Sequence, residues 1–89
     1  MDLDEHIVRA AGQKLPLTYK EYEILKLFLS RPGVVFSRQQ MFDAVWGSGY
    51  VGESRTVDMH IRTLRQKLGA CGGMIQTVRG VGYRFEAEP

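Results

Sequence analysis

The segment from Arg55 to Leu68, RTVDMHIRTLRQKL, has a periodicity that predicts an amphipathic helix with two contrasting faces. Its apolar residues recur every three or four positions and form one stripe: Val57, Ile61, Leu64 and Leu68. At roughly 100° per residue, the opposite face carries Arg55, Met59, Arg62 and Gln66, with Thr63 beside them. The helix is therefore expected to pack on a core along one face. Its other face presents long cationic and hydrogen-bonding side chains.

A basic hairpin is predicted directly after this helix. Residues 75–78 and 83–85 are rich in β-branched and aromatic residues, which favours two strands. Arg79 to Gly82 is expected to turn between them, with both glycines free to adopt positive φ. Arg79 then lies at the glycine-rich tip of the hairpin and provides a second basic group beside those of the helix. Because the major groove admits one helix, a basic helix followed by a basic hairpin predicts a winged helix that binds duplex DNA.

The remaining elements complete an α+β chain. Residues 6–9 and 14–17 are short extended candidates, and 34–36 is another. Thr18 with Glu21 forms a capping box, so a helix is predicted from Tyr19 until Arg31-Pro32-Gly33 ends it. Ser37 with Gln40 forms a second capping box, which opens a helix from Arg38 to about Trp46. Ser54 is expected to cap the basic helix, and residues 70–73 to form a flexible join.

Positive charge is concentrated in the two basic elements. Residues 54–85 carry six Lys or Arg and one Asp, a net charge of +5, although the whole chain carries only +2. Residues 1–53 carry six Lys or Arg and seven Asp or Glu, a net charge of −1. If only the charge is considered, a basic face exposed to water would be a sufficient explanation. Its coincidence with the outward face of the helix favours a polyanion as the partner.

Composition limits the remaining possibilities. A chain of 89 residues is expected to form a single domain over residues 1–89. Its apolar runs are far shorter than the ~20 residues that span a membrane, and its first residues do not resemble a secretory signal. The one cysteine, Cys71, cannot form an internal disulfide, which fits a reducing cytoplasm, and is interpreted as an inert loop thiol. A cytoplasmic protein without membrane attachment is expected.

Five segments resemble the DNA-binding effector domain of OmpR/PhoB-type bacterial response regulators. The resemblance covers about residues 6–85, and its last two motifs are specific in combination. In chain order, the segments are Leu17-Thr18 through Leu29, Pro32 through Arg38, Val45-Trp46-Gly47, Arg55 through Arg62, and Gln76 through Phe85.

The resemblance implies a winged helix-turn-helix with N-terminal antiparallel strands, three helices and a C-terminal β-hairpin wing. The third helix enters the major groove and the wing, residues 77–84, reaches the minor groove. The family arrangement has about four N-terminal strands, whereas two or three fit before Tyr19. No receiver domain is recognisable, so the chain is expected to be the effector part of a longer receiver–effector protein.

The resemblance also implies partners beyond one stretch of DNA. Relatives commonly bind two half-sites arranged as direct repeats. In relatives, the loop before the third helix can contact RNA polymerase. Here that loop comprises Gly47, Ser48, Gly49, Tyr50, Val51, Gly52 and Glu53.

Arg62 is the first candidate for reading a base, because an arginine fork matches O6 and N7 of guanine. An ion pair with Asp58, four residues earlier, is the alternative role, and the two are compatible. Met59 and Thr63 are candidates for contact with a thymine methyl group. Thr63 replaces a residue that is often basic in relatives, and an ordinary exposed side chain is an equal alternative for it. Gln66 completes the DNA-facing set on this helix.

Other residues are assigned to the DNA backbone or the wing. Arg55 opposes the helix dipole, which suggests a phosphate contact. Arg79 is expected in the minor groove, where a narrow groove attracts arginine. Tyr83 is expected either to contact phosphate or to pack under the wing. Trp46 is expected either to lie in the core or to contact the DNA backbone. Arg65 is expected to pair with Asp58 or to reach the DNA backbone. The resemblance implies phosphate contacts for Arg38 and His60, and Thr77 is a further phosphate candidate.

Enzymatic and cofactor roles are not predicted. Residues 47–52 match G-x-G-x-x-G, but no strand precedes them, which argues against a dinucleotide site. His6, His60 and Cys71 lack metal-ligand spacing, and no nucleophile with a base can be assembled. Two binding alternatives remain open. One is a module that docks an acidic protein, and the other is single-stranded RNA binding, which predicts exposed aromatic residues.

Overall fold

The computed structural model describes residues 2–4, 7–10, 13–47 and 52–86. An N-terminal antiparallel sheet has the order β1-β2-β3, with β1 at Asp2–Asp4, β2 at Ile7–Ala10 and β3 at Gln13–Leu15. The sequence indicated the second and third strands, although β3 ends at Leu15 rather than at residue 17. Pro16 follows, and proline has no N–H to donate to a sheet. The strand β1 was not assigned from its sequence, since pairing of Leu3 with Val8 defines it.

Two helices begin where their capping boxes predicted. Helix α1 spans Tyr19–Ser30, and Thr18 and Glu21 exchange both capping hydrogen bonds. Helix α2 spans Arg38–Trp46, and Ser37 and Gln40 do the same. Reciprocal caps satisfy N–H groups that a helix start leaves without partners, so these boundaries follow from local sequence.

Helix α3 spans Thr56–Leu68, and the prediction that Ser54 caps it is wrong. The residue at the cap position is Arg55, whose side chain makes no capping bond. The chain enters through a turn in which the carbonyls of Glu53 and Ser54 accept the N–H groups of Thr56 and Val57, each at 3.0 Å. Backbone carbonyl oxygens therefore accept the first N–H groups of α3, a role that was expected of the Ser54 hydroxyl.

The predicted flexible join is a 3-10 helix, η1, at Gly69–Met74. Its tight packing explains this difference. A Cβ added to Gly72 would lie 2.6 Å from the carbonyl oxygen of Arg65, so the turn presses against the end of α3. The glycines that suggested a loose segment instead allow a close approach.

The wing belongs to a second antiparallel sheet with the order β4-β6-β5. These strands are Val35–Ser37, Gly82–Phe85 and Ile75–Val78, so the hairpin has a third strand beside it. The turn prediction was half right. Gly80 has φ of 77°, whereas Gly82 is buried in β6. A Cβ on Gly82 would lie 2.0 Å from the carbonyl oxygen of Phe36, so Gly82 is needed for strand contact.

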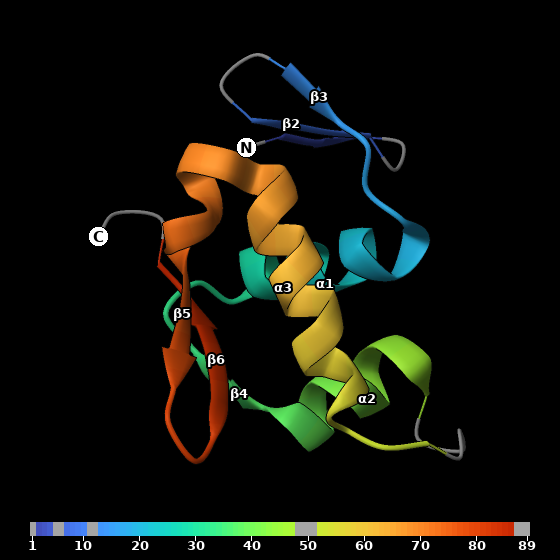
Figure 1. Cartoon of the computed structure of the whole chain (residues 1–89), viewed down its shortest axis with the longest axis vertical. Helices are drawn as coiled ribbons and strands as arrows, with labels where there is room; N and C mark the ends of the chain where they lie inside the picture. Colours follow the sequence, from blue (N-terminus) through green and yellow to red (C-terminus); the bar gives the residue numbers. More distant parts are fainter. Residues whose placement is uncertain (1, 5–6, 11–12, 48–51, 87–89) are drawn as a thin grey trace.

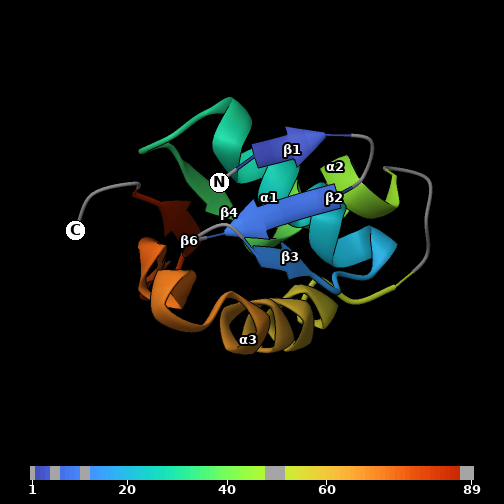
Figure 2. The same ribbon diagram turned by 90° about the horizontal axis from the view of Figure 1, so that it is seen from above.

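The core lies between the three helices and the wing sheet. Phe28 of α1 stacks on Phe85 of β6, with ring centroids 6.2 Å apart. Leu29 of α1 and Val45 of α2 pack against this core but are only partly buried. Figure 1 shows α3 crossing in front of α1, with the wing on one side and α2 at its N-terminal end. Figure 2 shows the N-terminal sheet lying across α1. This arrangement is a winged helix. The buried hydrophobic residues are Tyr22, Ile24, Leu25, Phe28, Met41, Phe42, Val57, Ile61, Leu64, Leu68, Ile75, Tyr83 and Phe85.

Candidate nucleic-acid interface

The outward face of α3 is exposed as the periodicity predicted. Its four members are Arg55, Met59, Arg62 and Gln66. Met59 retains 63% of its accessible surface, whereas no residue of the apolar stripe exceeds 4%. An apolar side chain this exposed in the middle of a basic face is available for contact with another molecule. The face therefore combines two arginines, an amide and a flexible apolar side chain along one line.

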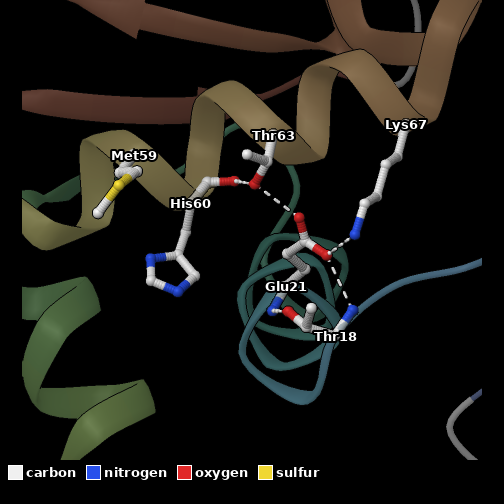
Figure 3. A pocket seen from close by; sticks show the side chains of 6 residues that line it. All are labelled: Thr18, Glu21, Met59, His60, Thr63 and Lys67. Carbon is white, nitrogen blue, oxygen red and sulfur yellow. Dashed lines mark hydrogen bonds and ion pairs between the residues drawn. The ribbon is translucent and has the colours of Figure 1, made fainter.

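Thr63 does not belong to this face. Its hydroxyl donates to Oε2 of Glu21 on α1 at 2.6 Å, and the carbonyl oxygen of His60 lies 3.1 Å from the same hydroxyl oxygen. The side chain is therefore turned toward α1 (Figure 3). The hydroxyl is bound to Glu21, so the expected contact with a thymine methyl group remains a prediction for the methyl group of Thr63 alone.

Glu21 is the polar centre of this flank and was identified from sequence only as a capping residue. It is 2% exposed, and its Oε1 accepts from Lys67 Nζ at 2.6 Å and from the N–H of Thr18 at 2.8 Å. Burial alone raises the pKa of Glu21, but hydrogen bonds from Lys67, Thr18 and Thr63 outweigh it and lower the pKa to about 2. The carboxylate is thus charged and fully engaged.

A hollow of about 310 Å³ opens beside Glu21 between α1 and α3. Figure 3 shows Met59 and His60 at one end of it and Lys67 at the other. The polar groups at its base already bind one another. The surface that lines the hollow is therefore mainly apolar. Its six lining residues are Thr18, Glu21, Met59, His60, Thr63 and Lys67.

The opposite flank of α3 is held by Asp58. Its Oδ1 accepts from Arg38 Nε at 2.7 Å and from the Tyr83 hydroxyl at 2.5 Å. The alternative role of Arg62, an ion pair with Asp58, is not formed, because Asp58 binds Arg38 and Tyr83 instead. Burial raises the pKa of Asp58, but the hydrogen bonds from Tyr83 and Arg38 and the charge of Arg38 lower it overall. These contacts join α2, α3 and β6 at one oxygen.

Arg65 ties the same flank to β5. Its Nε and Nη2 donate to the carbonyl oxygen of Ile75 at 3.2 and 2.8 Å, and Nη2 also donates to Thr77 Oγ1 at 2.9 Å. Pairing with Asp58 was one of its two expected roles, and the structure shows contacts with β5 in its place. Thr77 remains exposed while accepting this bond. Arg65 therefore holds the wing against α3.

Tyr83 and Trp46 take mainly structural positions. Tyr83 is 5% exposed and packs under the wing, which was one of its two expected roles. The Trp46 ring is partly buried and stacks on Phe42 at 5.2 Å between centroids, and the His60 ring meets it edge-on at 5.0 Å. His60 Nδ1 also lies 3.0 Å from the carbonyl oxygen of Thr56. Both side chains are partly exposed.

The ends of the predicted interface are exposed. Arg79 stands at the wing tip, beside Gly80 with its φ of 77°. Arg55 is exposed at the start of α3 and forms an ion pair with Glu53. Of the predicted polymerase-contact loop, Gly47, Gly52 and Glu53 are exposed. Residues 48–51 lie outside the described residues.

The described ranges contain neither a membrane-spanning helix nor a metal-binding cluster. None of the helices there combines the length and apolar character required to cross a membrane. In the same part of the chain, no group of three His, Cys, Asp or Glu side chains is arranged to hold a metal ion. The clustered polar residues described above instead bind one another and position α3.

Comparison with known proteins identifies relatives of the whole chain. A family model described as "Transcriptional regulatory protein, C terminal" matches residues 12–85. Transcriptional regulatory protein SrrA of Staphylococcus aureus is 45% identical over 92 residues, covering 99% of this chain and 38% of SrrA. The chain thus spans well under half the length of this relative.

Solved structures agree with the fold. The DNA-binding domain of response regulator AdeR, in complex with an intercistronic region, has a TM-score of 0.83 and 36% identity, covering 97% of this chain and 90% of that one. The DNA-binding domain of Bacillus subtilis CssR has a TM-score of 0.82 and 34% identity, covering 94% of this chain and 97% of that one.

Proposed function

Because the chain belongs to the family of C-terminal domains of transcriptional regulatory proteins, the OmpR/PhoB-type effector domains, we propose that it binds specific sequences in double-stranded DNA. Helix α3 enters the major groove and the wing lies at the adjacent minor groove. The observation that carries this proposal is the exposed outward face of α3. Both flanks of the helix are occupied by contacts within the protein, and the basic face is left for an external partner.

Base recognition is assigned to the outward face. Arg62 stands mid-helix, where its fork reaches O6 and N7 of a guanine. Met59 is the first side chain for a thymine methyl group, because it is far more exposed than Thr63, whose hydroxyl binds Glu21. Gln66 lies one turn beyond Arg62 and offers an amide to a neighbouring base edge. Arg79 at the wing tip reads the width of the minor groove.

Phosphate contacts position the domain on the duplex without reading sequence. The candidates surround the outward face. Arg38 starts α2, Arg55 starts α3, and Thr77 lies on the wing strand β5. His60 and Trp46, which are both partly exposed, supply further contacts. Tyr83 contributes indirectly, through its hydrogen bond to Asp58.

The domain acts as the effector part of a two-component response regulator in the bacterial cytoplasm. The match to only 38% of SrrA supports a longer protein in which a receiver domain accompanies this one. Tandem direct-repeat half-sites are the proposed target arrangement. The loop of residues 47–53 is the proposed contact for RNA polymerase. Both proposals come from the family resemblance.

Selection against a random duplex library at low salt tests the function directly. The bound pool is sequenced after several rounds with the 89-residue chain. Enrichment of one half-site, single or repeated, supports sequence-specific binding and supplies the target. Binding without enrichment contradicts specificity by the isolated domain. Absence of binding favours the protein-docking alternative, which a pull-down with polymerase subunits then examines.

A further inference from the structure

We propose that Asp58 is a positioning residue for DNA binding, which aims Arg38 at a phosphate and fixes the wing relative to α3. The inference rests on the proposed function and adds a role for a residue that carries the wrong charge to touch DNA. Its basis is the three-element junction at Asp58 Oδ1, where α2, α3 and β6 meet.

The first step concerns the orientation of Arg38. Its Nε donates to Asp58 Oδ1 at 2.7 Å, and its guanidinium lies 5.7 Å from the centre of the Tyr83 ring. Only one of the five N–H donors of an arginine is on Nε. The four donors on the two Nη groups are therefore not used in this contact. A guanidinium held at Nε keeps its Nη fork for a bidentate phosphate contact. Pre-ordering this long side chain lowers the entropy lost on binding.

The second step concerns the wing. Tyr83 pairs with Thr77 across the hairpin and with Phe36 of β4, so its position determines where the hairpin lies. Its hydroxyl binds Asp58, and Arg65 lies 5.5 Å from the centre of the same ring while holding Ile75 and Thr77. Arg79 follows β5 directly. The junction therefore sets the distance between the helix in the major groove and the wing tip.

The third step concerns charge. Asp58 is the only acidic residue between residues 54 and 85, and its side chain is 40% exposed. If this carboxylate acted only through its charge, removing it would strengthen binding to a polyanion. A positioning role predicts the opposite sign. The direction of the change in affinity therefore distinguishes the two.

Fluorescence anisotropy with the selected duplex measures these effects on the full 89-residue chain. Asp58→Ala is expected to weaken binding about five- to tenfold, the scale of one lost hydrogen bond of ordinary net strength. Asp58→Asn keeps an acceptor oxygen at the same place and is expected to remain within about twofold of the original affinity. Asp43→Ala is the matched control, because it removes an exposed carboxylate of α2 outside the junction and should not weaken binding.

A double-mutant cycle separates positioning from general stability. In an Arg38→Ala background, Asp58→Ala is expected to cost only about twofold, because no guanidinium remains to be aimed and only the hydrogen bond from Tyr83 to the wing is lost. Equal losses in both backgrounds, or tighter binding by Asp58→Ala alone, would overturn the inference. Circular dichroism checks that each variant is folded.

Tyr83→Phe keeps the test decisive if Asp58→Ala does not fold. It removes one hydrogen bond to Asp58 and leaves the ring in the core. About a twofold loss of affinity is expected, and unchanged affinity would contradict the role of the junction. If the unmodified chain binds no duplex at all, the proposed function fails together with this inference. Binding by the unmodified chain with no effect of the variants rejects only the inference.

Discussion

Arg62 and Thr63 are neighbours on α3, yet they face different partners. Arg62 is exposed toward solvent, while Thr63 donates to the buried carboxylate of Glu21. A rotation of roughly 100° between successive helical residues is enough to separate an outward-facing side chain from one that contacts a neighbouring helix. A residue next to a predicted contact residue in the sequence is therefore not an equivalent candidate for the same contact.

Replacing Arg62 tests the assignment of base reading. Arg62→Ala is expected to cost ~1–3 kcal/mol at the cognate guanine, because a bidentate contact is lost. The measurement compares affinity for the selected duplex with affinity for duplexes changed at each position. Discrimination should relax at one base pair only. Equal losses on cognate and scrambled duplexes would assign Arg62 to the DNA backbone.

Glu21 makes stability depend on pH in the acid range. Its pKa falls from an ordinary value of 4.5 to about 2 in the folded protein. A lowered folded-state pKa stabilises the protein above the unfolded value, and this contribution is lost as pH falls from 4.5 toward 2. It amounts to a few kcal/mol at neutral pH.

Glu21→Gln should therefore unfold at a markedly lower temperature at pH 7, and the difference from the unmodified chain should shrink below about pH 4. Thermal melts followed by circular dichroism between pH 7 and pH 2 measure this. Glu23→Gln, two positions along α1, leaves the contacts of Glu21 in place and serves as the control. A difference that stays constant with pH would contradict the ionised state of Glu21.

At the scale of elements, each helix start illustrates how far local signals reach. The two capping boxes predicted the first residues of α1 and α2, because their hydrogen bonds span three residues. Helix α3 lacks such a box, and its start was placed one residue early. The wing sheet shows the same limit. Strand β4 was predicted close to its place, but its pairing with β6 joins residues far apart in the chain.

Gly82 offers a prediction at this scale. Gly82→Ala should destabilise the fold by about 3 kcal/mol or more, because its Cβ would collide with a backbone carbonyl of β4 that cannot move aside. Chemical denaturation measures the free energy of unfolding. Gly73→Ala is the matched control, since nothing lies within 4 Å of its added Cβ. Equal stability of the two variants would show that β4 and β6 are less closely joined.

At the scale of the whole molecule, charge and shape act together. The net charge of +5 over residues 54–85 falls on α3 and the wing, which the fold places side by side. The N-terminal sheet lies across α1. Affinity for DNA should therefore depend on salt in proportion to the phosphates that this one surface contacts.

Arg55→Ala should weaken binding to all duplexes alike and flatten the slope of log affinity against log salt by about one unit. Titrations at several salt concentrations give this slope. Lys26→Ala removes an exposed cation of α1 outside the proposed interface and should leave the slope unchanged. If Arg55→Ala also leaves it unchanged, Arg55 makes no phosphate contact and its ion pair with Glu53 persists on DNA.

Sequence alone determined the order of most elements, the first residues of α1 and α2, the apolar stripe of α3 and its exposed opposite face. These features depend on helical periodicity and on side chains a few residues apart. Their prediction needed no knowledge of the rest of the chain. The family resemblance also followed from motifs that can be read along the sequence.

Only the tertiary structure decided how α3 is held. Thr63 meets Glu21 across 42 positions and Tyr83 meets Asp58 across 25, and neither pairing has a periodic signal. The same holds for Gly82, whose close approach to Phe36 depends on the pairing of β4 with β6. Contacts between distant residues depend on how several elements pack at once. For that reason, periodicity identified the outward face of α3, and packing decided which flanking side chains are turned inward.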